Sequence, residues 1–202
     1  MSPSNPAQDV GHKNRLMKYK NDFFLNWIES YRKKKTPRIM ILGFFDEDFL
    51  QKLRKKDSYL TIVDQKHYFE SESVTARHTY YDIVIAREII EHVHDQNKFM
   101  EFCYNLLRKD GLLLLETSNV HTWHSKLLFL FSDYLSFFRG KYIENYEHKH
   151  PLFTWSLEQL IKEKFRIEKK EFNFGVIPFL RIRFRTKRKL FGDSFNIVLR
   201  KI

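Results

Sequence analysis

Four ionisable residues stand together after one short apolar run of the sequence. The run Tyr81–Ala86 is followed by Arg87, Glu88, Glu91 and His92. If the segment is helical, positions 88, 91 and 92 share one face, because side chains three and four positions apart are neighbours on a helix. Carboxylates beside an imidazole can move protons near neutral pH. The spacing predicts acid–base chemistry. A surface glutamate beside a histidine packed in the core would show the same spacing without any catalytic role.

A later loop rich in Tyr and His adds His148 and His150 before the sequence FTW. Two carboxylates with two imidazoles suit a divalent cation. We expect no metal, and the candidate ligands, should one bind, are Glu88, Glu91, His92 and His148.

Two other apolar runs end in residues that suit a nucleotide. The run RIMILG ends at Gly43, and the run from Tyr59 ends at Asp64, which lies 21 positions after Gly43. Nucleotide-binding sheets place an acid about 20 positions beyond such a glycine, where it accepts hydrogen bonds from ribose hydroxyls. A further polar strand end begins at Glu116.

Two kinds of element must position these residues, and they alternate along the chain. Short apolar runs predict strands, and segments of helical periodicity predict helices. Strands are expected at 38–43, 59–64, 81–86, 111–117, 165–172 and 195–200. Helices are expected at 19–34, 46–56, 99–107 and 123–138, with another introduced by a capping box at Ser156 and Gln159. Alternating strands and helices predict right-handed βαβ units and a parallel sheet. Ligands of such sheets bind at the carboxyl ends of the strands.

The segments YDIVIAREIIEHVHD (81–95) and KDGLLLLETSN (109–119) resemble the class I S-adenosylmethionine-dependent methyltransferases. The sequence after residue 119 resembles one branch of this family, whose members are encoded with surface-polysaccharide assembly enzymes. The resemblance implies an α/β, Rossmann-like fold with a mostly parallel sheet of seven strands, or six, flanked by helices and completed by an antiparallel C-terminal strand.

The same resemblance implies S-adenosylmethionine as cofactor and a hydroxyl or carboxyl of a glycan or lipid-linked precursor as methyl acceptor. It assigns cofactor binding to Gly43, Asp64, Arg87 and Glu88. It makes His92 or His148 the general base. Glu70 and Glu72 are candidates for the acid on the adenine side.

One motif departs from the family. Its glycine-rich turn has the form G-x-G-x-G after an acidic strand residue, whereas this chain has Phe45 and Glu47 at the later glycine positions and Ile41 at the acidic one. A Cβ obstructs a close approach of backbone to ligand. A methyltransferase-like scaffold without cofactor affinity is therefore one alternative. A metal-dependent RNA 3′-end 2′-O-methyltransferase, suggested by the Glu88, Glu91 and His92 spacing, is another.

Composition limits the partners. Hydrophobic residues make up 43% of the 202 residues, so a globular protein is expected. The formal net charge of +11 predicts an anionic partner. A basic cluster comprises Arg181, Arg183, Arg185, Lys187, Arg188 and Lys189. It suits phosphate on a glycan precursor or an anionic surface, with nucleic acid less favoured.

Residues 1–18 are polar, so we expect a flexible lead-in before a single domain at 19–202. The lone Cys103 excludes an intramolecular disulfide. No transmembrane span is expected, because Lys126 and Asp133 interrupt the apolar segment Trp123–Phe138. We assign this segment to the core, a substrate lid or an oligomer contact. The expected location is cytoplasmic or peripheral to the membrane.

Overall fold

A computed structural model describes residues 21–33, 35–54, 59–63, 81–144, 148–177 and 182–202. The predicted lead-in, Asp64, Glu70, Glu72 and Arg181 lie outside these residues. No helix among the described residues is long and apolar enough to cross a membrane.

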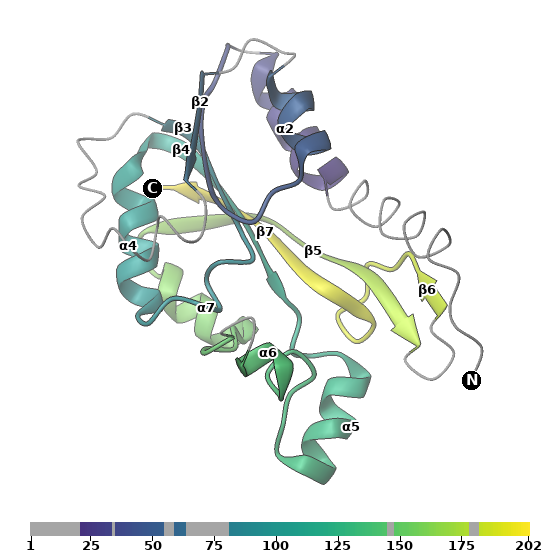
Figure 1. Cartoon of the computed structure of the whole chain (residues 1–202). Coiled ribbons are helices and arrows are strands. Elements are labelled where there is room, and N and C mark those ends of the chain that lie inside the picture. Colours follow the sequence, from purple (N-terminus) through teal and green to yellow (C-terminus); the bar gives the residue numbers. More distant parts are fainter. Residues whose placement is uncertain (1–20, 34, 55–58, 64–80, 145–147, 178–181) are drawn as a thin grey trace.

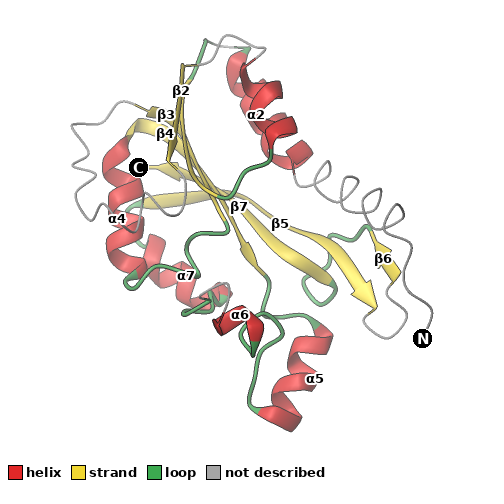
Figure 2. Cartoon of the chain, viewed as in Figure 1, coloured by secondary structure: helices red, strands yellow, loops and turns green. Residues whose placement is uncertain are grey.

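One twisted sheet runs through the described part of the chain (Figures 1 and 2), and its strands follow the order β2-β1-β3-β4-β7-β5-β6. The strands are β1 (Arg38–Gly43), β2 (Tyr59–Val63), β3 (Tyr81–Arg87), β4 (Leu107–Ser118), β5 (Phe165–Ile177), β6 (Ile182–Phe184) and β7 (Gly192–Lys201). Strands β2, β1, β3 and β4 pair in parallel, whereas β7 pairs antiparallel with β4 and β5. The predicted parallel sheet with an antiparallel C-terminal strand is therefore confirmed.

Helices cover both faces of this sheet. They are α2 (Glu47–Arg54), α4 (Gln96–Leu106), α5 (Trp123–Ser132), α6 (Lys141–Glu144) and α7 (Thr154–Ile161), and residues 21–32 are also helical. Helices α4 and α7 pack on one face, while α2 and residues 21–32 pack on the other. Figure 1 shows α5 apart from the sheet.

Strand β3 explains why its sequence is a continuous apolar run. Successive side chains of a strand point to opposite faces. Accordingly, Val84 and Ala86 join the core beneath α4, and Ile83 and Ile85 join the core beneath α2. Because both faces are covered by helices, both sets of side chains must be apolar.

Two local predictions are wrong, and the helix that would place Glu88, Glu91 and His92 on one face does not form. Residues 88–94 form a turn, not a helix, because Glu88 takes a left-handed φ of 46° at the end of β3. The helix from Trp123 ends at Ser132, where Asp133 adopts a left-handed conformation. Helix α7 begins at Thr154, and the Ser156 hydroxyl accepts a hydrogen bond from the Phe153 N–H at 3.0 Å, so Ser156 occupies the third helical position instead of the N-cap.

Candidate functional site

The turn after β1 lies against the end of β3. Gly43 has a φ of +90°, and a Cβ at this position would lie 2.2 Å from the Arg87 carbonyl oxygen. The neighbouring Phe44 N–H donates to that same oxygen at 2.9 Å. A glycine is thus required here by the close contact between two strand ends.

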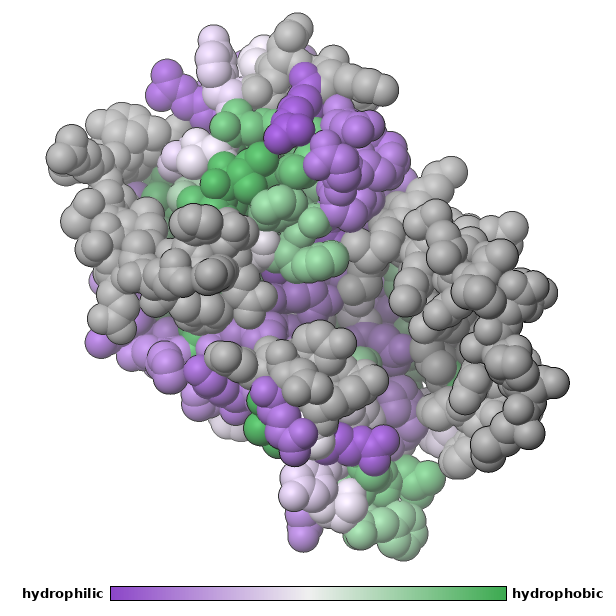
Figure 3. Space-filling view, in the orientation of Figure 1, coloured by the Kyte–Doolittle hydropathy of each residue, from purple (hydrophilic) through white to green (hydrophobic). Residues whose placement is uncertain are grey.

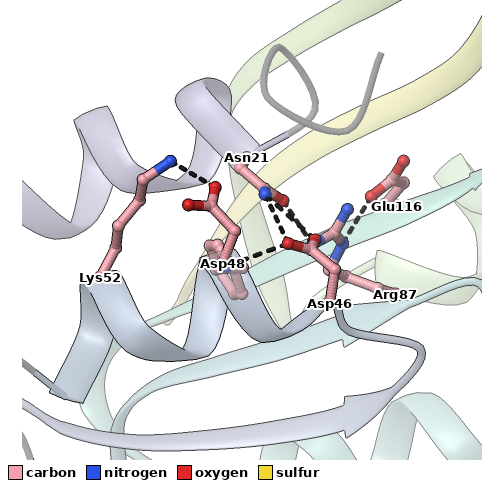
Figure 4. A network of polar contacts seen from close by, with 7 residues as sticks. Asn21, Asp46, Asp48, Lys52, Arg87 and Glu116 are labelled. Atoms are coloured by element: carbon pink, nitrogen blue, oxygen red, sulfur yellow. Dashed lines mark hydrogen bonds and ion pairs between the residues drawn. The ribbon is translucent and has the colours of Figure 1, made fainter. Parts of the chain in front are cut away.

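Arg87 forms the centre of a polar cluster at the carboxyl ends of β3 and β4 (Figure 4). Its Nε lies 2.7 Å from Glu116 Oε2, and its Nη1 donates to Asn21 Oδ1 at 2.9 Å. Asn21 Nδ2 in turn donates to both carboxylate oxygens of Asp46, at 3.2 and 3.0 Å. The same Arg87 Nη1 lies 3.9 Å from Asp46 Oδ2. Four residues from four separate segments therefore form one network, which we call the Arg87 cluster.

The Arg87 cluster lies on the face of the sheet covered by α2. The Arg87 guanidinium carbon is 5.5 Å from the centre of the Phe24 ring and 5.1 Å from that of Phe49. Aromatic faces attract a desolvated cation. Asp46 also accepts the Phe49 N–H at 3.0 Å, so it caps the start of α2 while it faces Arg87.

A second group of polar side chains lies beyond the end of β3. Ligand atoms of Glu91, His92 and His148 all lie within 4.8 Å of one another, which allows them to hold a metal ion. The rings of His92 and His148 meet edge to face, with centroids 4.7 Å apart. Glu88 is joined to this group through Ser118, whose hydroxyl donates to Glu88 Oε2 at 3.4 Å. We call Glu88, Glu91, His92 and His148 the histidine cluster.

The backbone holds the histidine cluster together. The Lys149 and His150 N–H groups both donate to the Glu91 carbonyl oxygen, at 2.9 and 3.0 Å. His148 Nδ1 lies 2.8 Å from the Phe137 carbonyl oxygen. Since a carbonyl only accepts, Nδ1 carries the proton and Nε2 of neutral His148 is the basic nitrogen.

Burial changes the acidity of this cluster. It lowers the pKa of His148, against the opposing effects of the Phe137 hydrogen bond and the Glu88 charge, so His148 is largely neutral at pH 7. Burial and then the adjacent Glu88 carboxylate raise the pKa of Glu91 well above its ordinary value. This glutamate favours a bound proton or a neighbouring cation over a bare charge.

The residues predicted from sequence thus form two groups. Arg87 and Glu88 are adjacent in sequence, yet Arg87 joins Glu116 and Asp46 while Glu88 joins Ser118 and the histidines. Sequence reasoning missed Asn21, because an asparagine in an amphipathic segment gives no signal of a partner 66 positions away. Phe45 packs against the apolar core beneath α2.

The basic cluster predicted from sequence has acidic neighbours. Lys187 Nζ lies 3.3 Å from Glu171 Oε2. Arg185 and Lys187 line a cavity of about 290 Å³ together with Asp22 and Glu171. The charge of this segment is therefore partly balanced by β5 and by residues 21–32, whereas Arg188 and Lys189 remain on the exposed loop before β7.

The described part of the chain forms a seven-stranded α/β sheet with polar groups at the carboxyl ends of β1, β3 and β4. This is a Rossmann-like fold, whose ligands bind at that edge of the sheet. A model of the methyltransferase domain family matches residues 26–163, which is more than half of the chain. The chain belongs to this family.

Solved structures show the same fold. Magnesium protoporphyrin IX methyltransferase from Synechocystis PCC 6803, with bound SAH, aligns with a TM-score of 0.58 at 13% identity over 100% of this chain and 90% of that one. A SAM-dependent methyltransferase from Archaeoglobus fulgidus aligns with a TM-score of 0.51 at 15% identity over 90% of this chain and 94% of that one. The predicted α/β class I methyltransferase fold is confirmed.

One curated relative matches a shorter stretch. The ubiquinone biosynthesis O-methyltransferase of Glaesserella parasuis serovar 5 (strain SH0165) is 31% identical over 67 residues, which are 33% of this chain and 28% of that protein. The chain therefore carries a methyltransferase domain by family, and its fold is that of solved S-adenosylmethionine-dependent methyltransferases.

The chemistry of the Arg87 cluster fits the amino-acid end of S-adenosylmethionine. That end carries one carboxylate and one ammonium group, and the cluster offers a guanidinium for the former and the Asp46 and Glu116 carboxylates for the latter. In the structure these groups contact one another. Because Arg87 and Glu116 are buried and already paired with each other, this cluster would hold the cofactor only after that ion pair opens.

Proposed function

We propose that this chain transfers a methyl group from S-adenosylmethionine to a hydroxyl or carboxyl group of a glycan or lipid-linked precursor. The observation that carries the proposal is the fixed orientation of His148. Its Nδ1–H is held by the Phe137 carbonyl, and the lowered pKa keeps Nε2 able to accept a proton at neutral pH. His148 then takes the proton of an acceptor hydroxyl, and His92, in ring contact with it, orients the imidazole.

The proposal also assigns the residues that would bind the cofactor. Arg87, Asp46 and Glu116 would bind the amino-acid end, and Gly43 and Glu88 would line the remainder of the site. Asp64, which lies outside the described residues, stays a predicted ribose ligand. The bound cofactor supplies an electrophilic methyl group. The protein residues bind and orient the two substrates, and His148 takes the proton of a hydroxyl acceptor, whereas an ionised carboxylate acceptor carries no proton to remove.

The acceptor class is supported by charge. Arg188 and Lys189 are exposed on the loop before β7, and the Trp123 N–H at the start of α5 donates to the Leu190 carbonyl oxygen at 2.8 Å. This loop therefore lies beside the segment that follows β4. Phosphate on a lipid-linked glycan suits such a basic loop.

The test compares His148→Gln with His150→Gln. His150 is an exposed histidine two positions away and serves as the matched control. We expect His148→Gln to lower methyl transfer from labelled S-adenosylmethionine to a lipid-linked glycan fraction by about 10²-fold or more, as loss of a general base does. His150→Gln should retain activity, and equal activity of both variants would contradict the role of His148.

Cofactor binding is measured separately by calorimetric titration with S-adenosylhomocysteine. Saturable binding that is weakened by Asp64→Ala or Arg87→Lys supports the enzyme. The self-pairing of the Arg87 cluster favours the scaffold alternative, for which we expect no binding heat at millimolar ligand.

A second candidate function is metal-assisted methyl transfer to the 3′ end of RNA. The mutual proximity of Glu91, His92 and His148 favours it. In this case Mn²⁺ should bind with saturable heat, and Glu91→Gln should abolish that heat while Glu101→Gln, at an exposed position of α4, leaves it unchanged. RNA affinity should also fall steeply with added salt, and failure of either result removes this candidate.

A further inference from the structure

Helix α5 and the residues directly after it expose large apolar side chains to solvent. The relative exposure is 46% for Leu127, 53% for Phe129, 73% for Leu130, 79% for Phe131 and 51% for Tyr134. Figure 3 shows hydrophobic residues gathered over α5 at the lower end of the molecule. Of the three assignments made for this segment, the core is thus wrong for α5, because Ser125 is its only buried residue, whereas a substrate lid and an oligomer contact stay predictions.

Most of these side chains form one stripe. Leu127, Leu130 and Phe131 are spaced at i, i+3 and i+4, which places them on one face of the helix. Ser125, on the opposite side, accepts the Ser136 N–H at 3.1 Å and ties α5 to the chain that follows it. We call the stripe the α5 apolar surface.

Basic residues border the α5 apolar surface. Lys126 is exposed beside the stripe, and Arg139 is exposed in the segment that follows α5. Lys126 also lowers the pKa of Lys189, after the larger effect of burial, so these two cations lie near each other across separate loops. An apolar face edged by Lys and Arg is typical of helices that lie on anionic bilayers.

The position of α5 connects this surface to the histidine cluster. The helix begins five residues after β4 ends, and the segment that follows it contributes the Phe137 carbonyl that holds His148. The Phe138 ring also lies 5.3 Å from that of His148. A bilayer in contact with α5 would therefore lie beside the proposed acceptor site.

We propose that the α5 apolar surface docks this protein on an anionic lipid bilayer, with Leu130 and Phe131 entering the acyl boundary and Lys126, Arg139 and Lys189 facing the lipid phosphates. The ten residues of α5 extend about 15 Å, half the thickness of a bilayer core of roughly 30 Å. Because α5 is too short to cross the bilayer, it would lie along the membrane surface. A second copy of the chain is the less favourable occupant, because two chains of net charge +11 would bring their basic borders together.

The experiment is sedimentation of the full chain with vesicles of phosphatidylglycerol and phosphatidylcholine, and with phosphatidylcholine alone. We expect binding to the anionic vesicles and much weaker binding to the neutral ones. Leu130→Ser with Phe131→Ser should weaken binding by at least about tenfold, since each side chain loses its transfer into the acyl region. Lys126→Glu should weaken it by about fivefold or more.

Matched controls separate these effects from a general change of surface. Tyr59→Ser removes an apolar side chain that is 72% exposed at β2, and Lys109→Glu reverses an exposed charge near the start of β4. Both controls should bind as the unmodified chain does. Circular dichroism should show the same content of secondary structure in every variant.

Three results would overturn the proposal. These are no sedimentation with anionic vesicles, equal binding of the α5 variants and their controls, or a dimer in light scattering that the Leu130→Ser, Phe131→Ser variant abolishes without any vesicle binding. None of these measurements depends on methyl transfer, so the docking proposal and the proposed function fail independently.

Discussion

Arg87 and Glu116 form a buried ion pair between the ends of β3 and β4. The two residues are register partners in neighbouring parallel strands, and Arg87 Nε lies 2.7 Å from Glu116 Oε2. Their side chains are 1% and 0% exposed. Because removal of one partner leaves an uncompensated charge away from water, this contact links stability to the proposed cofactor site.

Glu116→Gln should therefore lower the free energy of unfolding by about 3 kcal/mol. The reason is that, among the described residues, the buried Arg87 would keep only the more distant Asp46 carboxylate as an acidic partner. Urea denaturation measures the change. Lys52→Ala is the control, since Lys52 pairs with Asp48 on the exposed side of α2 and such pairs contribute little (Figure 4). A Glu116→Gln variant as stable as the control would show that the pair carries no net stabilisation.

Gly43→Ala should destabilise the protein more than Gly140→Ala does. Both glycines have positive φ, at 90° and 44°, and a left-handed alanine costs about 1–2 kcal/mol. At Gly43 the new Cβ would also meet a backbone oxygen, whereas at Gly140 no described atom beyond the chain neighbours lies within 4 Å of it. Thermal unfolding of both variants checks the order, and equal melting temperatures would contradict the close contact with Arg87.

His121 should make stability fall with acidity. Burial, followed by the charges of Lys189 and Lys126, lowers the pKa of His121 to about 4. Between pH 6.5 and 4 the unfolded chain binds a proton that the folded chain does not, so stability is lost as pH falls through this window. His121→Gln should flatten this part of the profile in urea titrations at stepped pH. An unchanged slope would show that His121 is protonated in the folded state.

Glu91 should act with the opposite sign. Its raised pKa means that the unfolded chain releases a proton near pH 4.5 while the folded chain retains it. The stabilising effect of protonated Glu91 is complete below that pH and is lost as pH rises toward the folded value. Relative to Glu91→Gln, the unmodified chain should lose stability as pH increases from 4 to 8, and added Mn²⁺ should reverse the loss if the histidine cluster binds a cation.

Local sequence accounts for much of the fold. The continuous apolar runs of β1 and β3 predict strands covered on both faces, and the structure buries Ile41 and Ile85 completely. The helical periodicity of Phe99, Cys103 and Leu106 predicts α4, whose start is capped by Asp95. These predictions hold because periodicity and capping depend on neighbours within a few positions along the chain.

The candidate site was only partly predictable. Its strand ends at Gly43, Arg87 and Glu116 follow from the rule that parallel strands end at one edge of the sheet. The separation of Arg87 from Glu88 does not follow, because it results from the left-handed turn at Glu88. Neither does the meeting of His92 with His148, which depends on the Lys149 and His150 hydrogen bonds to Glu91.

The sequence by itself determined the alternation of strands and helices, the family and the concentration of charge, since these depend on residue type and short spacing. Only the tertiary structure decided which groups face one another and which apolar residues stay in water. Asn21 reaches Arg87 and Phe137 reaches His148 because distant segments pack together, and Phe131 remains exposed because no other described segment covers α5. Burial is a property of the packed neighbours, which the composition of one segment does not specify.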